Sequence, residues 1–598
     1  MGKAQRVIIV GGGLAGLMTT IKACEAGLEV DLFSVVPVKR SHSACAQGGI
    51  NGAVNTKGEG DSPAEHFDDT VYGGDFLANQ PPAKKMCEAA PGIIYLMDRL
   101  GVPFNRTNEG LLDFRRFGGT KHHRTAFAGA STGQQLLYAL DEQVRRFEAE
   151  GKVRKFETWE YLGFIKNNDG HCCGIVATNI YTMEVKSFRA SAVALGTGGP
   201  GMVFGKSTNS VINTGAAAAM TYLQGVKYAN GEFIQVHPTA IPGEDKLRLM
   251  SESARGEGAR VWVPKNGKPW YFLEEMYPAY GNLVPRDIAT RAIHKVVHEM
   301  GLGVDGQSVV YLDLSHIPAA SLRAKLGAIL EIYEKFMGDD PTKVPMKVFP
   351  AVHYSMGGLW VDYDQMTSVP GLFAVGECDY SIHGANRLGA NSLLSCIYAG
   401  MVAGPAMTKW TKGLKTSVDD LPANGFDSQT KWHSDRIEKI KKMDGPENPF
   451  QIGRELGEWM TRNVTVVRNN DKLKETDNKI IELHERWLKC GVNDPGNWAN
   501  QSVHYTRQIY AMLQLARVIT IGALKRDESR GAHYKPDFPN RDDEKFMKTT
   551  IAVHKGPMLD GAAFGSAQEM GEPKLSYDPI DVSLIKPRPR KYDVEKKT

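Results

Sequence analysis

The sequence predicts an α/β protein with a helical part toward its C-terminus, and three observations support this. Its 598 residues exceed what one hydrophobic core supports, so about two to four domains are expected. Glycine-rich turns follow short apolar strands at residues 7–16, 194–199 and 371–377, as is typical of dinucleotide-binding domains. Beyond about Lys412, apolar residues recur at helical spacing instead.

The first glycine turn has the context of a nucleotide-binding motif. Residues 7–10 form a predicted buried strand, residues 11–16 (GGGLAG) open a helix to about Ala26, and residues 28–33 form a second strand. The glycines allow a pyrophosphate close to the backbone, and the helix N-terminus stabilises its charge. Ser34 stands where an acidic residue usually binds the ribose, and its hydroxyl is able to replace that contact. This motif alone does not distinguish NAD from FAD.

A second segment indicates that the dinucleotide is FAD. Residues 371–377 (GLFAVGE) form an apolar strand that ends in Gly-Glu, which resembles the second FAD motif of flavoproteins. Two FAD-contacting segments more than 300 residues apart imply an insertion between them. We therefore predict a Rossmann-like FAD-binding domain (1–232 and 353–411) with an inserted α+β capping domain (233–352). A helical domain (412–540) and a C-terminal extension (541–598) follow.

The helical domain is predicted from two periodic segments. Both read as packed antiparallel helices, and their apolar residues are Leu473, Ile480, Leu483 and Trp487, then Ile509, Met512, Leu513, Ala516 and Ile519. The Pro- and Arg-rich stretch 586–590 is predicted to be an extended arm or a solvated tail.

The composition excludes several classes of function. A net charge of +4 gives no electrostatic case for nucleic-acid binding. No apolar run approaches the roughly 18 residues that span a bilayer, and the first strand begins at Arg6, which leaves no room for a signal or transit peptide. These features favour a bacterial-type cytosolic location. The eight cysteines include no CxxC pair, so we expect reduced thiols, no iron–sulfur centre and no metal site in this chain.

Histidines, arginines and a hydroxyl recur in and after the insertion. Arginine grips a carboxylate bidentately and histidine adds charge-assisted hydrogen bonds, so this set next to a flavin suits a small dicarboxylate. Any one of these residues alone is more often structural, so the prediction of a dicarboxylate site depends on finding them together. The motifs are 237–239 (HPT), 251–258 (SESARGEG), 286–287 (RD), 353–358 (HYSMGG), 383–389 (HGANRLG) and 391–394 (NSLL).

Residues 40–42 (RSH), followed by 46–49 (AQGG), complete the pattern. In order and spacing, these motifs resemble the succinate dehydrogenase/fumarate reductase flavoprotein family over essentially the whole chain. The resemblance is nearest to the flavoprotein subunits of menaquinone-linked Gram-positive bacterial enzymes. It implies that His42 tethers FAD covalently, and that the other residues in contact with FAD are Gly11, Gly12, Gly13, Leu14, Ala15, Gly16, Ser34, Gly48, Gly49, Glu377, Ser392 and Leu393.

The resemblance also implies the chemistry. His237, Ser251, His353 and Arg387 would hold the two carboxylates of succinate or fumarate. A hydride would pass from succinate to the flavin, while Arg286 takes a proton from the adjacent carbon and Glu252 and Arg255 relay it. Ser251 replaces a common Thr, and Ala216 replaces a common Asp, so no polar FAD contact is assigned to Ala216.

Partners and alternatives follow from the same resemblance. An iron–sulfur protein subunit would receive the electrons, and a membrane cytochrome b anchor subunit would pass them to menaquinone, which places the chain on the cytoplasmic face of the membrane as a peripheral subunit. The rival enzyme is L-aspartate oxidase, which binds FAD without a covalent link; the sequence Arg40-Ser41-His42 argues against it. A non-catalytic FAD-binding scaffold is the other alternative. Succinate oxidation is favoured over fumarate reduction on overall resemblance alone.

Overall fold

A parallel five-stranded sheet carries the glycine turns. The computed structural model describes residues 5–243, 247–380, 382–556 and 570–592. The sheet has the order β19-β10-β1-β2-β6, and every neighbouring pair is parallel. Its strands are β1 (Arg6–Val10), β2 (Glu29–Ser34), β6 (Val153–Glu157), β10 (Val193–Leu195) and β19 (Leu372–Ala374). The two strands predicted at the start of the chain correspond to β1 and β2.

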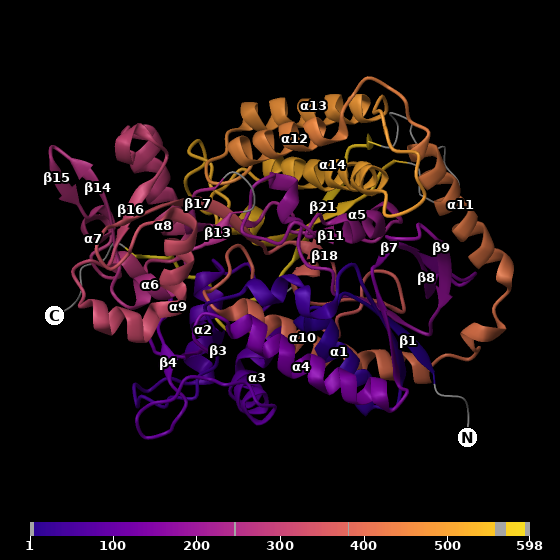
Figure 1. The fold of residues 1–598 in the computed structure, drawn as a ribbon, viewed down its shortest axis with the longest axis horizontal. Helices are drawn as coiled ribbons and strands as arrows, with labels where there is room; N and C mark the ends of the chain where they lie inside the picture. The colour runs from indigo at the N-terminus through magenta and orange to yellow at the C-terminus, as the bar shows by residue number, and fades with distance from the viewer. Residues whose placement is uncertain (1–4, 244–246, 381, 557–569, 593–598) are drawn as a thin grey trace.

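Opposite faces of this sheet belong to different hydrophobic cores. Because side chains alternate along a strand, Val7 and Ile9 pack into the core under one layer of helices, whereas Ile8 and Val10 pack into the core on the other face. The helices of the first core lie together in the lower part of Figure 1 and are α1 (Leu14–Glu25), α3 (Gln80–Arg99), α4 (Thr132–Ala149) and α10 (Asn391–Lys412). The other core includes α5 (Ala216–Leu223) and residues of the antiparallel strands β7 (Trp159–Lys166) and β8 (Cys172–Asn179), which pair with β9 (Val185–Arg189).

The insertion forms a second sheet with its own core. Its order is β13-β12-β17-β16-β14-β15, and Val261, Leu312 and Leu330 lie in a separate buried cluster. The strands are β12 (Ile234–Ile241), β13 (Arg248–Leu249), β14 (Arg260–Lys265), β15 (Lys268–Trp270), β16 (Val310–Asp313) and β17 (Met346–Ser355). The helices, at the left of Figure 1, are α6 (Ser253–Gly256), α7 (Phe272–Met276), α8 (Arg286–His294) and α9 (Ala319–Met337).

The chain enters and leaves the insertion along one antiparallel pair. Ile234 of β12 lies opposite Ser355 of β17, so β17 continues past the predicted boundary at residue 352. Both connections between the two domains therefore lie side by side, next to the residues that the sequence selected at 237 and 353.

The helical part contains α11 (Ala423–Lys441), α12 (Pro449–Asn463), α13 (Asn470–Trp487) and α14 (Gln501–Lys525). Helices α12, α13 and α14 lie together at the top of Figure 1. All nine apolar residues that predicted this part are buried, and the Trp487 Nε1 donates a hydrogen bond of 2.8 Å to the Thr506 carbonyl.

The C-terminal extension is integrated into the FAD-binding part. Strands β20 (Lys548–Val553) and β21 (Lys574–Pro579) complete a four-stranded sheet with β11 (Tyr228–Ala229) and β18 (Gly358–Leu359), in the order β18-β11-β20-β21. Of the two predictions for 586–590, the extended arm is the one observed, because Arg588 pairs with Asp68 and Arg590 with Asp287. The remaining short elements are α2 (Pro63–Gly73), α15 (Asp543–Phe546), and the small sheet of β3 (Ile50–Asn51), β4 (Phe114–Arg115) and β5 (Thr125–Ala126).

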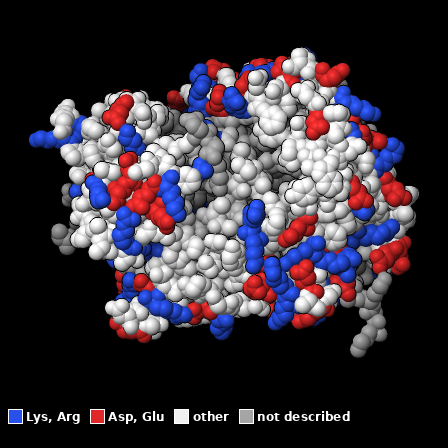
Figure 2. Space-filling view, in the orientation of Figure 1, with Lys and Arg blue, Asp and Glu red and all other residues white. Residues whose placement is uncertain are grey.

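The surface in Figure 2 carries charges of both signs, and the cysteines are not cross-linked. On the face in Figure 2, Lys and Arg side chains lie among Asp and Glu side chains. All eight cysteines are within the described residues and none forms a disulfide. Among the helices of the described ranges, none combines the length and apolar character needed to cross a bilayer.

Candidate active site

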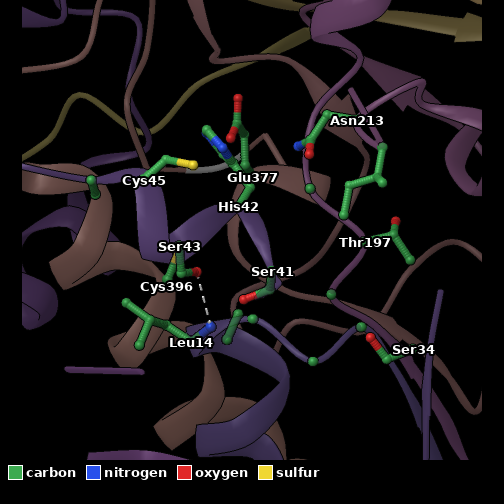
Figure 3. A pocket seen from close by; sticks show the side chains of 18 of the residues that line it. Leu14, Ser34, Ser41, His42, Ser43, Cys45, Thr197, Asn213, Glu377 and Cys396 are labelled. Carbon is green, nitrogen blue, oxygen red and sulfur yellow. Dashed lines mark hydrogen bonds between the residues drawn. The ribbon is translucent and has the colours of Figure 1, made fainter. Parts of the chain in front are cut away.

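A cavity lies where the three glycine turns converge (Figure 3). The turn after β1, the turn after β10 and the turn after β19 all line it, as the carboxyl ends of neighbouring parallel strands must. Most of the residues predicted to contact FAD lie on its wall: Gly11, Gly12, Gly13, Leu14, Ala15, Ser34, His42, Glu377, Ser392 and Leu393.

The first turn fits a pyrophosphate. Gly11 has φ of +118°, and a Cβ there would lie 2.1 Å from the Gly196 carbonyl oxygen, so only glycine keeps the turn and the neighbouring strand this close. Gly13 caps α1 without a side chain. The Leu14 amide donates to Ser43 Oγ at 3.2 Å, the dashed line in Figure 3. The first residues of α1 line the cavity, so the positive end of the helix dipole lies where it stabilises an anion.

Three predicted FAD residues lie behind this wall. A Cβ on Gly16 would lie 1.9 Å from the Gly11 oxygen, so Gly16 lets α1 pack against the turn. Gly48 packs on the Phe117 ring and Gly49 on the Ala126 carbonyl. None of the three lines the cavity, and a direct contact between them and FAD stays a prediction.

His42 begins a short 3₁₀ turn (His42–Cys45) and borders the cavity (Figure 3). Its Nδ1 accepts a hydrogen bond of 3.2 Å from the Ser210 amide. Its Nε2 lies 3.3 Å from the Asn209 Nδ2. Asn209 and Ser210, which follow the second glycine turn, therefore hold the His42 ring at the cavity.

Glu377, in the turn after β19, also faces the cavity (Figure 3). Its Oε1 accepts from the Ser355 amide at 3.0 Å. Burial raises the pKa of Glu377 to about 7. Thr197, Asn213 and Cys396 line the same wall, although the sequence argument assigned none of them to the site.

A buried ion network holds the predicted proton-transfer residues. Arg286 starts α8, and its Nη2 and Nε donate to Glu252 Oε2 at 2.7 and 2.9 Å. Arg255 Nη2 donates to Glu252 Oε1 at 2.9 Å. Burial by itself raises the pKa of Glu252, but Arg286 and Arg255 outweigh it and bring the pKa below its usual value. Glu252 is therefore an ionised acceptor shared by two guanidinium groups.

Gln235 joins the ion network of Arg286 and Glu252 to Arg387, although no sequence motif had predicted it as a site residue. Its Oε1 accepts from Arg286 Nη1 at 3.0 Å and from Arg387 Nη2 at 2.9 Å. Burial, and then the charge of Arg286, lower the pKa of Arg387 to about 9, and its Cζ lies 4.4 Å from the centre of the Tyr354 ring. A sequence signal existed, because Gln235 lies two residues before the predicted site residue His237, which is the spacing of side chains on one face of a strand.

Two histidines complete the cluster. The rings of His237 and His353 lie 5.1 Å apart. Burial, followed by the charge of Arg286, holds the pKa of each well below its usual value. His353 Nδ1 lies 2.7 Å from Thr208 Oγ1, and Ser251 Oγ donates to Ser253 Oγ at 3.0 Å.

Unpaired donors mark where an anion fits. Within the described ranges, His237 Nε2 and Arg387 Nε are buried without a hydrogen-bond partner. Since buried polar groups are nearly always paired, these atoms indicate a ligand with acceptor oxygens. His353 and Tyr354 also line the large cavity, so the ligand site and the proposed flavin site share a wall. The described residues contain no group of three or more His, Cys, Asp or Glu side chains placed to hold a metal ion.

Comparison with known proteins decides the family. Residues 6–393 match the family described as FAD binding domain, and residues 453–592 match the family described as fumarate reductase flavoprotein C-term. The chain is 66% identical over 590 residues to the succinate dehydrogenase flavoprotein subunit of Bacillus subtilis, with 99% of both chains covered. This chain belongs to the succinate dehydrogenase/fumarate reductase flavoprotein family.

Solved structures agree with this assignment. A mutant of E. coli quinol fumarate reductase superposes with a TM-score of 0.90 at 32% identity over 99% of each chain. Mycobacterium smegmatis Sdh1 in complex with UQ1 gives 0.82 at 28% identity, covering 97% of this chain and 95% of that one. The predicted fold class is confirmed, and so is the prediction of an FAD-dependent oxidoreductase of this family. The second family match covers residues 453–592, which include much of the predicted helical domain and most of the predicted extension.

Proposed function

We propose that this chain is the catalytic flavoprotein subunit of a succinate:quinone oxidoreductase and interconverts succinate and fumarate. The observation that supports it most directly is the buried cluster around Gln235, with its unpaired donors on His237 and Arg387, at the edge of the cavity. A four-carbon dicarboxylate offers acceptor oxygens at both ends, which suits donors on opposite sides of one small site.

Each residue then has one task. Bound FAD supplies the hydride acceptor. Arg387, His353 and His237 hold the carboxylates, with Ser251 as a further donor. Arg286 gives one of its own protons to ionised Glu252 through their direct contact at 2.7 Å, and takes up the proton from the carbon next to the one that loses hydride. Arg255, which also donates to the Asn282 carbonyl at 2.8 Å, continues the relay.

Burial makes this arrangement effective. Glu252 and Arg255 are 1% and 2% exposed, so charges formed during the reaction interact without screening by bulk water. The low pKa of both histidines keeps them neutral, and the positive charge at the substrate comes from the arginines.

Activity of an Arg286→Gln variant tests the assignment. We expect turnover to fall by about 100- to 10,000-fold, the usual contribution of a proton-transfer group, while flavin content stays at the wild-type level. Arg323→Gln is the matched control, since Arg323 lies in the same inserted domain and pairs with Glu334 and Asp340 at the surface, away from the arginine cluster. Full activity in Arg286→Gln would make the mechanism wrong.

We further propose that His42 carries the flavin covalently. The cavity position of its ring, held by Ser210 and Asn209, supports this. Denatured wild-type protein should keep flavin fluorescence on the peptide that contains His42, whereas His42→Ser should bind FAD and release it on denaturation. Complete release from mature wild-type protein would return L-aspartate oxidase chemistry as the better proposal.

The proposed partners are an iron–sulfur protein subunit, a membrane cytochrome b anchor subunit and, through them, menaquinone. The chain would lie on the cytoplasmic face of the membrane as a peripheral subunit. The relatives named quinol fumarate reductase and succinate dehydrogenase support this assembly, and the 66% identity to the latter favours succinate oxidation. Purification from membranes with native partners, followed by both rates with a menaquinone analogue, tests assembly and direction together.

A further inference from the structure

The last described residues, 581–592, form a segment that we call the C-terminal arm. It first runs beside the start of α3, where Gln80 Oε1 accepts from the Leu584 and Ile585 amides at 2.9 and 2.8 Å and Gln80 Nε2 donates to the Ile585 carbonyl at 2.8 Å. Arg588 then pairs with Asp68 of α2 through contacts of 2.8 and 2.6 Å. The arm is thus fixed along the FAD-binding domain.

Arg590 extends from the arm to the inserted domain. Its Nη1 donates to Asp287 Oδ2 at 2.8 Å and its Nη2 to Asp287 Oδ1 at 3.3 Å. The same Nη1 lies 3.5 Å from Asp75 Oδ2, just after α2. Its side chain is 7% exposed. One buried guanidinium therefore connects the FAD-binding domain to the residue that follows Arg286.

Tyr592 makes a second connection between the domains. Its ring centre lies 5.6 Å from that of Tyr72 on α2 and 5.2 Å from that of Tyr280 in the inserted domain. The Lys591 amide donates to the Tyr72 hydroxyl at 2.6 Å, and Arg590 Nε donates to the Tyr592 hydroxyl at 3.2 Å. The ring is 5% exposed, so it fills the gap between α2 and the inserted domain.

The contacts of Asp287 explain how Arg590 affects the position of Arg286. Its side chain is 1% exposed, and besides Arg590 it contacts Arg291 at 3.5 Å and accepts from Asn386 Nδ2 at 3.2 Å. Asn386 immediately precedes Arg387. A buried carboxylate that loses its best-paired cation is strongly destabilised in place, and Asp287 lies in the first turn of the helix that Arg286 begins.

We infer that Arg590 is a positioning residue for Arg286: through Asp287 and Asp75, the C-terminal arm holds the start of α8 against the FAD-binding domain. This inference rests on the proposed role of Arg286. The carboxylate-holding residues lie on other elements, His237 on β12, His353 on β17 and Arg387 before α10. Loss of Arg590 should therefore slow the chemical step much more than it weakens substrate binding.

The test compares Arg590→Gln with Arg590→Lys and Arg588→Gln in the complete enzyme purified with its native partners. We measure kcat and KM for succinate, the kinetic isotope effect with deuterated succinate, and hydrogen exchange of peptides from α8. Arg588 is the matched control because it anchors the same arm to the FAD-binding domain alone, at a surface where ion pairs contribute little.

For Arg590→Gln we expect kcat to fall about 10- to 100-fold, as for a small misplacement of a reacting group, with KM within about threefold of wild type. The isotope effect should rise and α8 should exchange faster. Arg590→Lys should recover part of kcat, and Arg588→Gln should stay within about twofold of wild type. Flavin-loaded Arg590→Gln with wild-type kcat, isotope effect and α8 exchange would overturn the inference.

Two further outcomes distinguish a failure of this inference from a failure to fold and from a failure of the proposed function. Should Arg590→Gln not fold, Tyr592→Leu loosens the second connection and must show the same change in kcat and α8 exchange, or the inference fails. Should the wild-type complex not oxidise succinate, the proposed function falls, while faster exchange of α8 in Arg590→Gln still supports the arm's hold on this helix and unchanged exchange refutes it.

Discussion

Replacing Gln235 with methionine removes a side chain that bridges Arg286 and Arg387. The change keeps length and approximate volume but deletes two acceptor contacts, at 3.0 and 2.9 Å, to guanidinium groups. It also deletes two donor contacts, to the Arg387 carbonyl at 2.7 Å and the Asn386 side chain at 2.9 Å. Gln235 is 0% exposed, so water does not replace these partners.

The magnitude follows from the two charged contacts. A hydrogen bond to a charged group contributes about 1.5 to 3 kcal/mol, and each 1.4 kcal/mol corresponds to about tenfold in rate. If the equivalent of one such contact is lost from the transition state, kcat/KM for succinate should fall about 10- to 150-fold. The neutral contacts add a loss of folding stability on the order of 1 to 3 kcal/mol.

The assay is steady-state succinate oxidation with an artificial electron acceptor, at matched flavin content. Gln224→Met is the control, because Gln224 makes two hydrogen bonds with the Phe164 backbone, at 3.0 and 2.8 Å, and none in the arginine cluster. It should lower stability and leave kcat/KM unchanged. A Gln235→Met enzyme within twofold of wild type would refute the view that Gln235 sets the arginine geometry.

Three further changes test the fold and the cavity. Gly11→Ala should abolish FAD binding, measured by flavin absorbance after purification, because its Cβ would overlap the Gly196 carbonyl at 2.1 Å; retained flavin would contradict this reading of the turn. Since burial raises the pKa of Glu377 from 4.5 to about 7, the folded flavin-free protein binds this proton more tightly than the unfolded chain. The contribution of Glu377 to its stability should therefore fall, by at most about 3 kcal/mol, as pH rises from 4.5 to about 7. In urea titrations the free energy of unfolding of the wild type minus that of Glu377→Gln should decrease by this amount, and a pH-independent difference would contradict the assignment. Trp487→Ala should cost about 3 to 5 kcal/mol in the same titrations, because the ring is 1% exposed; a loss below about 1 kcal/mol would show that the helical part packs differently.

Local sequence pattern carried much of the prediction. The strand–turn–helix at residues 6–25 and the apolar periodicity of α13 and α14 depend on neighbours within a few turns of chain, and both form where predicted. The candidate site residues at 42, 252, 286, 353 and 387 came from motifs in order along the chain, and the fold brings 252, 286 and 387 into one hydrogen-bonded cluster through residue 235.

Other features had no local signal. Gly48 and Gly49 lie in a predicted FAD-binding motif but pack behind the cavity wall, because a motif names a segment and not the direction in which its residues face. The stretch 586–590 was predicted to be either an extended arm or a solvated tail, because its charges meet partners only in the folded chain.

The sequence by itself therefore predicted the nucleotide-binding turn, an insertion between two FAD-contacting segments and the candidate residues of the arginine cluster other than Gln235. Only the tertiary structure decided that Gln235 bridges two arginines and that Arg590 reaches Asp287, 303 positions earlier in the chain. Side-chain hydrogen bonds between such distant residues leave no periodicity in the sequence, because their geometry depends on how separate sheets and helices pack.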